Sequence, residues 1–158
     1  MRALKASVNF DALDILHREI HLHLDRLHSL AHQIEADGVD TAAQHEAGSI
    51  ESFFSSHARK HHLEEETRVF PSLLASRNLD LVGTVHRLRQ DHGWIEEDWL
   101  CLAPQLRAMA MGSTWIDLAE FQHNAQVFIA LCREHLAIED TLVYPEAKAR
   151  QSDARHAG

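Results

Sequence analysis

Along four stretches of the chain, apolar residues recur at alternating intervals of three and four, the pattern of a helix with one buried face. In the first stretch the pattern stops at ADGVD, where Gly38 is a suitable C-terminal end. The second ends near Pro71, the third around MGST, and Pro145 is expected to close the fourth. The pattern predicts an all-α protein, an up-down-up-down four-helix bundle over residues 1–147 with a polar C-terminal tail over 148–158.

Each apolar stripe is interrupted by a histidine, or by a histidine and a glutamate four residues later. Residues four apart lie on one face of a helix, so each such pair points into the predicted core. The stripes run Leu13, His17, Ile20, Leu24, Leu27, Ala31 and Ile34; Phe54, Ala58, His61 and Glu65; Leu81, Val85, Leu88, His92, Ile95, Trp99, Leu102 and Leu106; and Leu118, Phe121, Ala125, Phe128, Cys132, His135, Glu139 and Leu142.

The polar members of the four stripes are expected to meet in one layer. In an up-and-down bundle, two residues at the same height lie equally far from the loop that connects their helices. The midpoints between successive polar positions fall at Asp40, between Arg77 and Asn78, and between Thr114 and Trp115. All three midpoints lie in or beside a predicted connection. The layer therefore consists of His17, His61, Glu65, His92, His135 and Glu139.

Two of the helices carry nearly the same polar sequence. HHLEEETRVFP, which begins at His61, and HLAIEDTLVYP, which begins at His135, share a histidine, a glutamate four residues on, a threonine, a valine and a proline. The repeat places the same pattern at the same phase of two helices. Two further positions hold similar residues, Asp140 for Glu66 and Tyr144 for Phe70.

Four imidazoles and two carboxylates in an apolar interior are costly without partners, because an unpaired buried carboxylate loses its hydration or takes up a proton. A pair of metal ions removes this cost, since each ion accepts neutral imidazole nitrogens while the carboxylates bridge the ions and cancel charge. Nitrogen and oxygen ligands without thiolate suit iron, manganese or zinc. The alternative is a set of hydrogen-bonded core histidines with two glutamates reaching water; the repeated pairs and the matched heights favour metal.

Composition narrows the class of protein. The chain has 158 residues, of which 45% are apolar, and only six glycines and three prolines, which favours helices over a turn-rich β fold. Acidic residues outnumber basic ones 24 to 15, so no nucleic-acid partner is expected. No segment approaches the ~18 apolar residues of a membrane span. The N-terminal sequence MRALKASVNF lacks the apolar stretch of a signal peptide, so a cytoplasmic location is expected.

The segments HREI, HHLEEETRVFP, RQDHGWIEEDW and HLAIEDTLVYP resemble the hemerythrin-like (HHE cation-binding) domain family. The resemblance covers about residues 10–147, and it implies a hemerythrin-like bundle that holds two iron ions without haem. It implies that Glu65 and Glu139 bridge the ions. The family's histidine ligands match His17, His61, His92 and His135, so the resemblance selects the same six residues as the stripes.

One departure from the family concerns the third helix. The oxygen-carrying hemerythrins have five ligand histidines, two of them four residues apart on this helix. Here Leu88 and Glu96 stand four residues before and after His92, so the second histidine is missing. Another residue or a water molecule fills this ligand position, or the position stays open. The candidates for further or alternative ligands are His21, His57, His62, His86 and Glu96.

The sequence thus predicts a di-metal protein, most simply di-iron, that binds or reduces a small diatomic ligand or peroxide in redox or stress handling. Dioxygen, peroxide and nitric oxide fit equally, and the residues favour neither binding nor turnover. An alternative is a metal-dependent sensor or interaction module without turnover. A third is a structural bundle that takes up metal adventitiously. The sequence indicates no particular oligomeric state.

Overall fold

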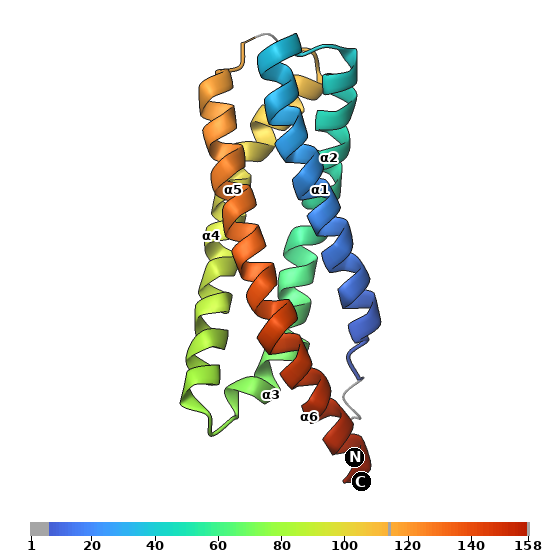
Figure 1. Cartoon of the computed structure of the whole chain (residues 1–158), viewed down its shortest axis with the longest axis vertical. Coiled ribbons are helices and arrows are strands. Elements are labelled where there is room, and N and C mark those ends of the chain that lie inside the picture. Colours follow the sequence, from blue (N-terminus) through green and yellow to red (C-terminus); the bar gives the residue numbers. More distant parts are fainter. Residues whose placement is uncertain (1–6, 114, 158) are drawn as a thin grey trace.

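The computed structural model of the protein describes residues 7–113 and 115–157 and is built from helices (Figure 1). No strand occurs in this part of the chain, which confirms the all-α prediction. Four helices are long, two are short, and two π-turns join the short helices to the long ones. In chain order the elements are α1 (Phe10–Asp37), α2 (Thr41–Glu64), η1 (Glu65–Val69), α3 (Phe70–Leu74), α4 (Leu79–Ala110), α5 (Leu118–Ile138), η2 (Glu139–Val143) and α6 (Tyr144–His156).

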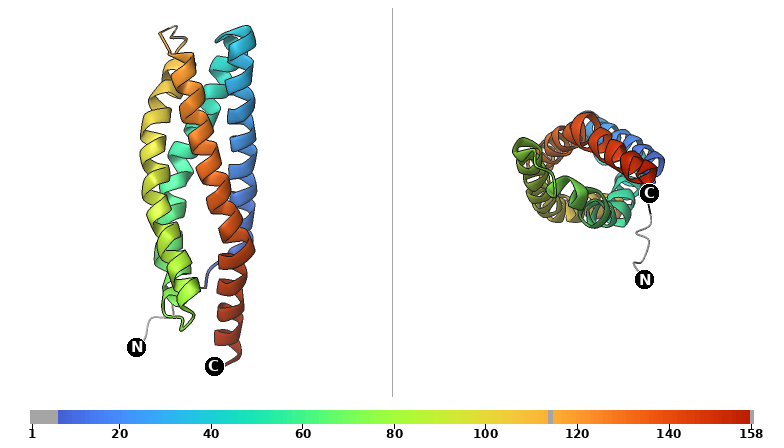
Figure 2. Two further views of the ribbon diagram at one scale, coloured as in Figure 1. Left: turned by 60° about the vertical axis from the view of Figure 1, so that its left-hand side comes forward. Right: turned by 90° about the horizontal axis from the view of Figure 1, so that it is seen from below.

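The four long helices form a ring in which α1 packs on α2, α2 on α4, α4 on α5, and α5 on α1. Seen from below, they surround a common axis (Figure 2). Successive long helices run in opposite directions and are joined at alternating ends (Figure 1), which confirms the up-down-up-down bundle. Among the described residues, no helix is both long and apolar enough to cross a membrane. Thr114, beside one predicted midpoint, lies outside the described residues, as do residues 1–6 and 158.

Each long helix begins at a side chain that accepts a hydrogen bond from a backbone N–H of the first turn. Such caps satisfy amides that have no partner within the helix. Two connections also contain a glycine with positive φ, a backbone conformation that favours glycine. The capping residues are Asn9, Asp40, Asn78 and Asp117, and the glycines are Gly38 (φ 70°) and Gly112 (φ 77°). Gly38 ends α1 as the sequence predicted.

Replacing the cap of α2 is expected to destabilise the bundle modestly. Asp40 accepts a 2.8 Å hydrogen bond from the backbone N–H of Ala43. We expect Asp40→Ala to lower the free energy of unfolding by about 1 kcal/mol in a urea titration. Asp153→Ala, at an exposed position of α6, serves as the control and should change it by less than about 0.5 kcal/mol. An effect of Asp40→Ala no larger than the control would contradict the prediction.

The apolar core falls into two clusters, one on each side of the predicted polar layer. The larger contains Leu24, Leu27 and Phe128 and lies towards the ends of the bundle that carry Gly38 and Gly112. The smaller contains Leu13, Phe70 and Tyr144 and lies towards α3 and α6. The stripes supply most of the larger cluster and, in the smaller one, Leu13, Leu81, Val85 and Leu88. Four apolar stripe positions are not buried: Ala58 and Trp99 are half-buried, and Leu118 and Leu142 are exposed.

The exposure of Leu142 follows from the π-turn η2. In an uninterrupted α-helix, Leu142 would lie on the same face as His135 and Glu139. In η2 the N–H of Tyr144 instead donates to the carbonyl of Glu139, five residues back, so the turn holds one more residue. Val143 is buried in place of Leu142. The same shift occurs in η1, where Val69 is buried and Arg68 is exposed.

Pro145 does not close the fourth helix, so this part of the sequence prediction is wrong. The chain stays helical to His156, and α6 extends below the other helices (Figure 1). Pro145 lies in the first turn of α6, after the π-turn, where a proline does not interrupt the helical hydrogen bonds. The predicted polar tail is therefore mostly helix. Its Arg150 donates hydrogen bonds to the carbonyl of Ser72 and the hydroxyl of Ser76.

Candidate metal centre

The six predicted side chains converge between the two apolar clusters. His17 comes from α1, His61 from the end of α2, and His92 from the middle of α4. His135 lies in the last turn of α5, and the two glutamates begin the π-turns η1 and η2. The π-turns thus occur at the same point of both sequence copies. Each of the six residues is at most 4% exposed, and both glutamates are fully buried.

These residues form two groups that share both carboxylates. The first, which we name position 1, consists of His17, His61, Glu65 and Glu139. The second, position 2, consists of Glu65, His92, His135 and Glu139. Within each group the possible ligand atoms all lie within 4.8 Å of one another. The arrangement therefore offers two neighbouring places for a cation.

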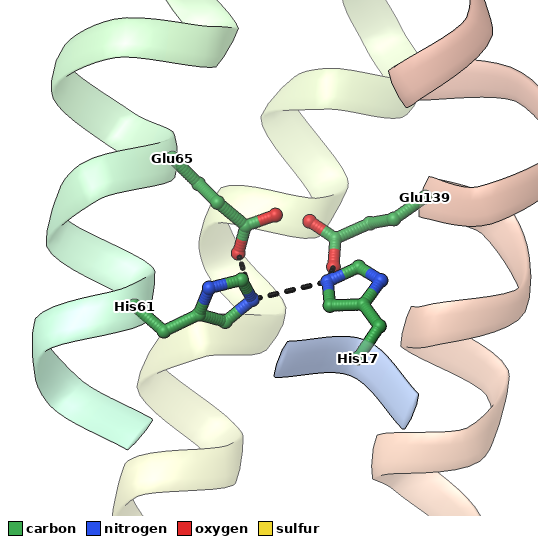
Figure 3. Close-up of side chains that lie close together, drawn as sticks. All are labelled: His17, His61, Glu65 and Glu139. Carbon is green, nitrogen blue, oxygen red and sulfur yellow. Dashed lines mark hydrogen bonds and ion pairs between the residues drawn. The ribbon is translucent and has the colours of Figure 1, made fainter. Parts of the chain in front are cut away.

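At position 1 the side chains point toward one another from three helices (Figure 3). The two imidazole Nε2 atoms of His17 and His61 are 3.1 Å apart. At position 2 the Nε2 atoms of His92 and His135 are also 3.1 Å apart. Each position thus has its own pair of imidazole nitrogens, and the two pairs have the same spacing.

The carboxylates lie between the two histidine pairs. Glu65 Oε1 is 3.3 Å from Nε2 of His61 and 3.3 Å from Nε2 of His92. Glu139 Oε1 is 3.3 Å from Nε2 of His135 and 3.6 Å from Nε2 of His17. Each glutamate therefore faces one histidine of each position, as a bridging carboxylate requires.

Unpaired polar atoms test whether this set fits metal ions. Glu65 Oε1 and both oxygens of Glu139 are buried without a hydrogen-bond partner. Buried polar groups are almost always paired, so several orphans in one layer need an explanation. Cations at positions 1 and 2 would supply the missing partners. The donor set of imidazole nitrogen and carboxylate oxygen fits a transition metal such as iron, manganese or zinc.

A second set of carboxylates supports the histidines from behind. Asp140 Oδ1 is 2.6 Å from His17 Nδ1, the nitrogen that faces away from the layer. Glu66 Oε2 lies 3.6 Å from His92 Nδ1. These acids occupy equivalent places in the two sequence copies, each following a bridging glutamate and each reaching a histidine of another helix. A carboxylate at hydrogen-bond distance, as Asp140 is, fixes the orientation of a metal-binding imidazole and raises its basicity, whereas His92 Nδ1 has no hydrogen-bond partner.

The other two histidines differ in their support. Asp91 Oδ2 lies 3.6 Å from His135 Nδ1, which is beyond hydrogen-bond distance. His135 Nδ1 and His61 Nδ1 are both buried without a hydrogen-bond partner, and only His135 has a carboxylate this close among the ion pairs of the described residues. The carboxylate near His135 comes from Asp91, the residue directly before His92 in the sequence. The equivalent residue, directly before His17, is the apolar Leu16, which has no carboxylate to offer. The sequence pattern did not indicate this role for Asp140, Glu66 or Asp91.

The additional candidates from the sequence lie outside both groups. His62 is buried, its ring stacks on that of His92 at 4.0 Å, and its Nδ1 lies 3.3 Å from Glu96 Oε1. This contact joins two of the candidates to each other rather than to the layer. His57 and His86 are exposed, and His21 and Glu96 are half-buried. Ligation by any of the sequence-predicted residues stays a prediction.

Tyr144 is a neighbour of the centre that the sequence pattern did not indicate. It is 1% exposed, and its hydroxyl donates a 2.9 Å hydrogen bond to Glu65 Oε2. The hydroxyl oxygen of Tyr144 is also 3.0 Å from His17 Nε2. The sequence feature that sets Tyr144 apart is its position in the second copy of the repeat, where the first copy has Phe70. Burial, and then the nearby carboxylates, raise the pKa of Tyr144, so the metal-free phenol keeps its proton.

Burial sets the protonation of the layer. It lowers the pKa of His61 and of His135 to about 4, so both imidazoles are neutral at pH 7. It raises the pKa of Glu139 to about 8, and burial with the neighbouring Glu139 carboxyl raises the pKa of Glu65. At pH 7 the metal-free layer therefore holds His61 and His135 as neutral imidazoles and at least one protonated carboxyl.

Metal binding at pH 7 is expected to release this proton. Cations bind the ionised carboxylate, so the affinity should rise with pH as the carboxyl with a pKa of about 8 ionises. His61 and His135 add no proton release above pH 6, because they are already neutral. Calorimetric titration with Zn²⁺ in two buffers of different ionisation enthalpy counts the protons. We expect about one proton fewer to be released at pH 9 than at pH 7; equal release at both would contradict the prediction.

Fold and site together define a four-helix bundle protein with a buried histidine and glutamate centre for metal. The family model of the hemerythrin HHE cation binding domain matches residues 8–147, and the chain belongs to this family. Neither the comparison with curated proteins nor that with solved structures found a match.

Proposed function

We propose that the protein holds two iron ions, one at position 1 and one at position 2, and binds or reduces a small oxidant. The oxidant is dioxygen, peroxide or nitric oxide, and the role is redox or stress handling in the cytoplasm. The observation that carries the proposal is the pair of ligand groups that share Glu65 and Glu139. When bound, iron would supply the electron exchange with the oxidant that these side chains alone lack.

A small cavity beside the layer supports a small ligand. Its volume is about 30 Å³, roughly twice the space that one water molecule needs. His61, His135 and Glu139 line it on the side of the metal layer, while Phe54 and Phe128 are among its apolar walls. A molecule of two non-hydrogen atoms, such as dioxygen, nitric oxide or peroxide, fits this space.

The chain's own residues prepare the centre for this chemistry. The two apolar clusters exclude water above and below the layer. Burial keeps the imidazoles of His61 and His135 neutral and ready to bind a cation. Asp140 holds His17 in one orientation through its 2.6 Å contact.

A sensor or interaction module is the second candidate function. The buried, unpaired oxygens of Glu65 and Glu139 favour it, because they destabilise the bundle when no metal is bound. Metal binding would then be coupled to folding, and a partner could recognise the metal-bound form. In that case iron raises the melting temperature strongly while added oxidant is not turned over.

The first test is the metal content per chain by mass spectrometry, with an absorption spectrum, on protein purified without a histidine tag or added metal. Two irons per chain, one for each group, and a rapid spectral change with several turnovers of oxidant are expected. Two irons without turnover would favour the sensor. Less than about half a metal per chain after anaerobic reconstitution with iron would overturn both functions.

A further inference from the structure

The two metal positions differ by one oxygen atom. Tyr144 follows η2 and its ring stacks on that of His17 at a centroid distance of 4.7 Å, on the side of position 1. In the first sequence copy, Phe70 follows η1 and its ring stacks on that of His92 at 5.6 Å, on the side of position 2. The two aromatic residues are thus equivalent in place. The hydroxyl of Tyr144 lies beside position 1, whereas Phe70 places only a hydrocarbon ring beside position 2.

The Tyr144 hydroxyl lies at the spacing of a ligand atom. Bonds from a transition metal to nitrogen or oxygen are about 2.1 Å long, so two ligand atoms at right angles lie about 3 Å apart. His17 Nε2 and His61 Nε2 have this spacing, at 3.1 Å. The hydroxyl oxygen is 3.0 Å from His17 Nε2 and 2.9 Å from Glu65 Oε2. The hydroxyl oxygen of Tyr144 therefore lies as far from His17 Nε2 and from Glu65 Oε2 as two ligand atoms of one metal ion lie from each other.

We propose that Tyr144 is an oxygen ligand of the metal at position 1. The inference rests on the proposed function only in requiring that metal binds there. On binding, the phenolic O–H bond breaks, its proton leaves to solvent, and the oxygen forms a bond to the cation without any change of oxidation state. The phenol oxygen of tyrosine is a known type of iron ligand. Its counterpart Phe70 offers no donor atom.

The proposal makes the two positions unequal. Position 1 has His17, His61, Tyr144 and the two shared carboxylates, whereas position 2 has two histidines and the same carboxylates. Position 2 therefore keeps more room for a ligand from outside. The histidine that is absent beside His92 would have served position 2, so Tyr144 at position 1 does not replace it.

The competing interpretation is that Tyr144 only donates a hydrogen bond to Glu65 and so orients the bridging carboxylate. In that case the phenol keeps its proton when metal binds. The state of the phenol in the metal-loaded protein separates the two interpretations.

The chain is well suited to this test because it contains a single tyrosine. Protein loaded with Zn²⁺, which is colourless, is compared with metal-free protein by ultraviolet difference spectroscopy. We expect the spectrum of an ionised tyrosine on loading, and this signal can come only from Tyr144. Loading with ferric iron should add a visible phenolate-to-iron charge-transfer band. Resonance Raman spectra excited in that band should show the vibrations of the phenolate ring.

Tyr144→Phe is the matched variant, since it keeps the ring and puts at this place the residue that the first copy has at position 70. We expect it to fold, to lack both signals, and to release about one proton fewer than the parent on binding Zn²⁺ at pH 9. Two bound metals in the parent without either signal would overturn the ligand role of Tyr144 and leave the metal centre intact. A chain that binds no metal would overturn the proposed function and this inference together.

Discussion

Replacing Glu65 and Glu139 together by methionine is expected to abolish metal binding and yet stabilise the metal-free chain. Both side chains are fully buried, and Glu65 Oε1 and the two oxygens of Glu139 lack hydrogen-bond partners. Methionine has a similar shape and no such atoms to bury. Exchanging buried ionic groups for apolar ones of similar volume stabilises proteins by about 1–4 kcal/mol. We expect a gain of this size in urea unfolding with chelator present, and a metal content near zero by mass spectrometry.

The controls are Glu64→Met and Glu134→Met, which change the residues that precede Glu65 and His135 in the sequence. Glu64 is half-buried and Glu134 exposed, and neither belongs to a ligand group. They should leave the metal content unchanged. Retention of two metals by the double variant, or a loss of stability in its metal-free form, would show that the layer is an ordinary polar core.

Asp140→Ala is expected to weaken metal binding about 10- to 100-fold, the usual effect of removing a carboxylate behind a ligand histidine. Asp140 contacts His17 Nδ1 at 2.6 Å and does not belong to either ligand group. Its loss frees the imidazole to rotate and lowers its basicity. Zinc affinity, measured by competition with a chromophoric chelator, gives the size of the effect.

Glu66→Ala provides a graded comparison, because Glu66 has the same place in the first sequence copy. Its carboxylate is 3.6 Å from His92 Nδ1, beyond the usual hydrogen-bond distance. We therefore expect a smaller loss of affinity than for Asp140→Ala. The reverse order, or no effect of Asp140→Ala, would rule out support of His17 through Nδ1.

The buried layer could be predicted because helical periodicity depends only on the local sequence. His17 and His92 interrupt apolar stripes, and Glu65 and Glu139 follow a histidine by one helical turn, so their direction is fixed by the helix itself. The short loops of an up-and-down bundle then set their heights. The structure brings all six residues together as the stripes predicted.

The supporting residues could not be predicted in this way. Asp140 and Glu66 lie next to stripe positions, where a carboxylate usually faces water, and their role depends on where a neighbouring helix places a histidine. Tyr144 was hidden for the opposite reason, since an aromatic residue on a buried face is normally apolar packing. Leu142 was wrongly placed in the core because η2 changes the helical phase after Glu139.

The two π-turns have a consequence for how the chain tolerates deletions. If Leu142 were removed and η2 became ordinary α-helix, Val143 and Tyr144 would follow Glu139 by three and four residues and still face the core. The packing of the bundle therefore does not need the extra residue. The extra residue instead changes the backbone at Glu139, whose carbonyl accepts a hydrogen bond from the N–H of Tyr144. A deletion scan of the last two helical segments should thus find its most permissive position for folding within one turn of the metal layer.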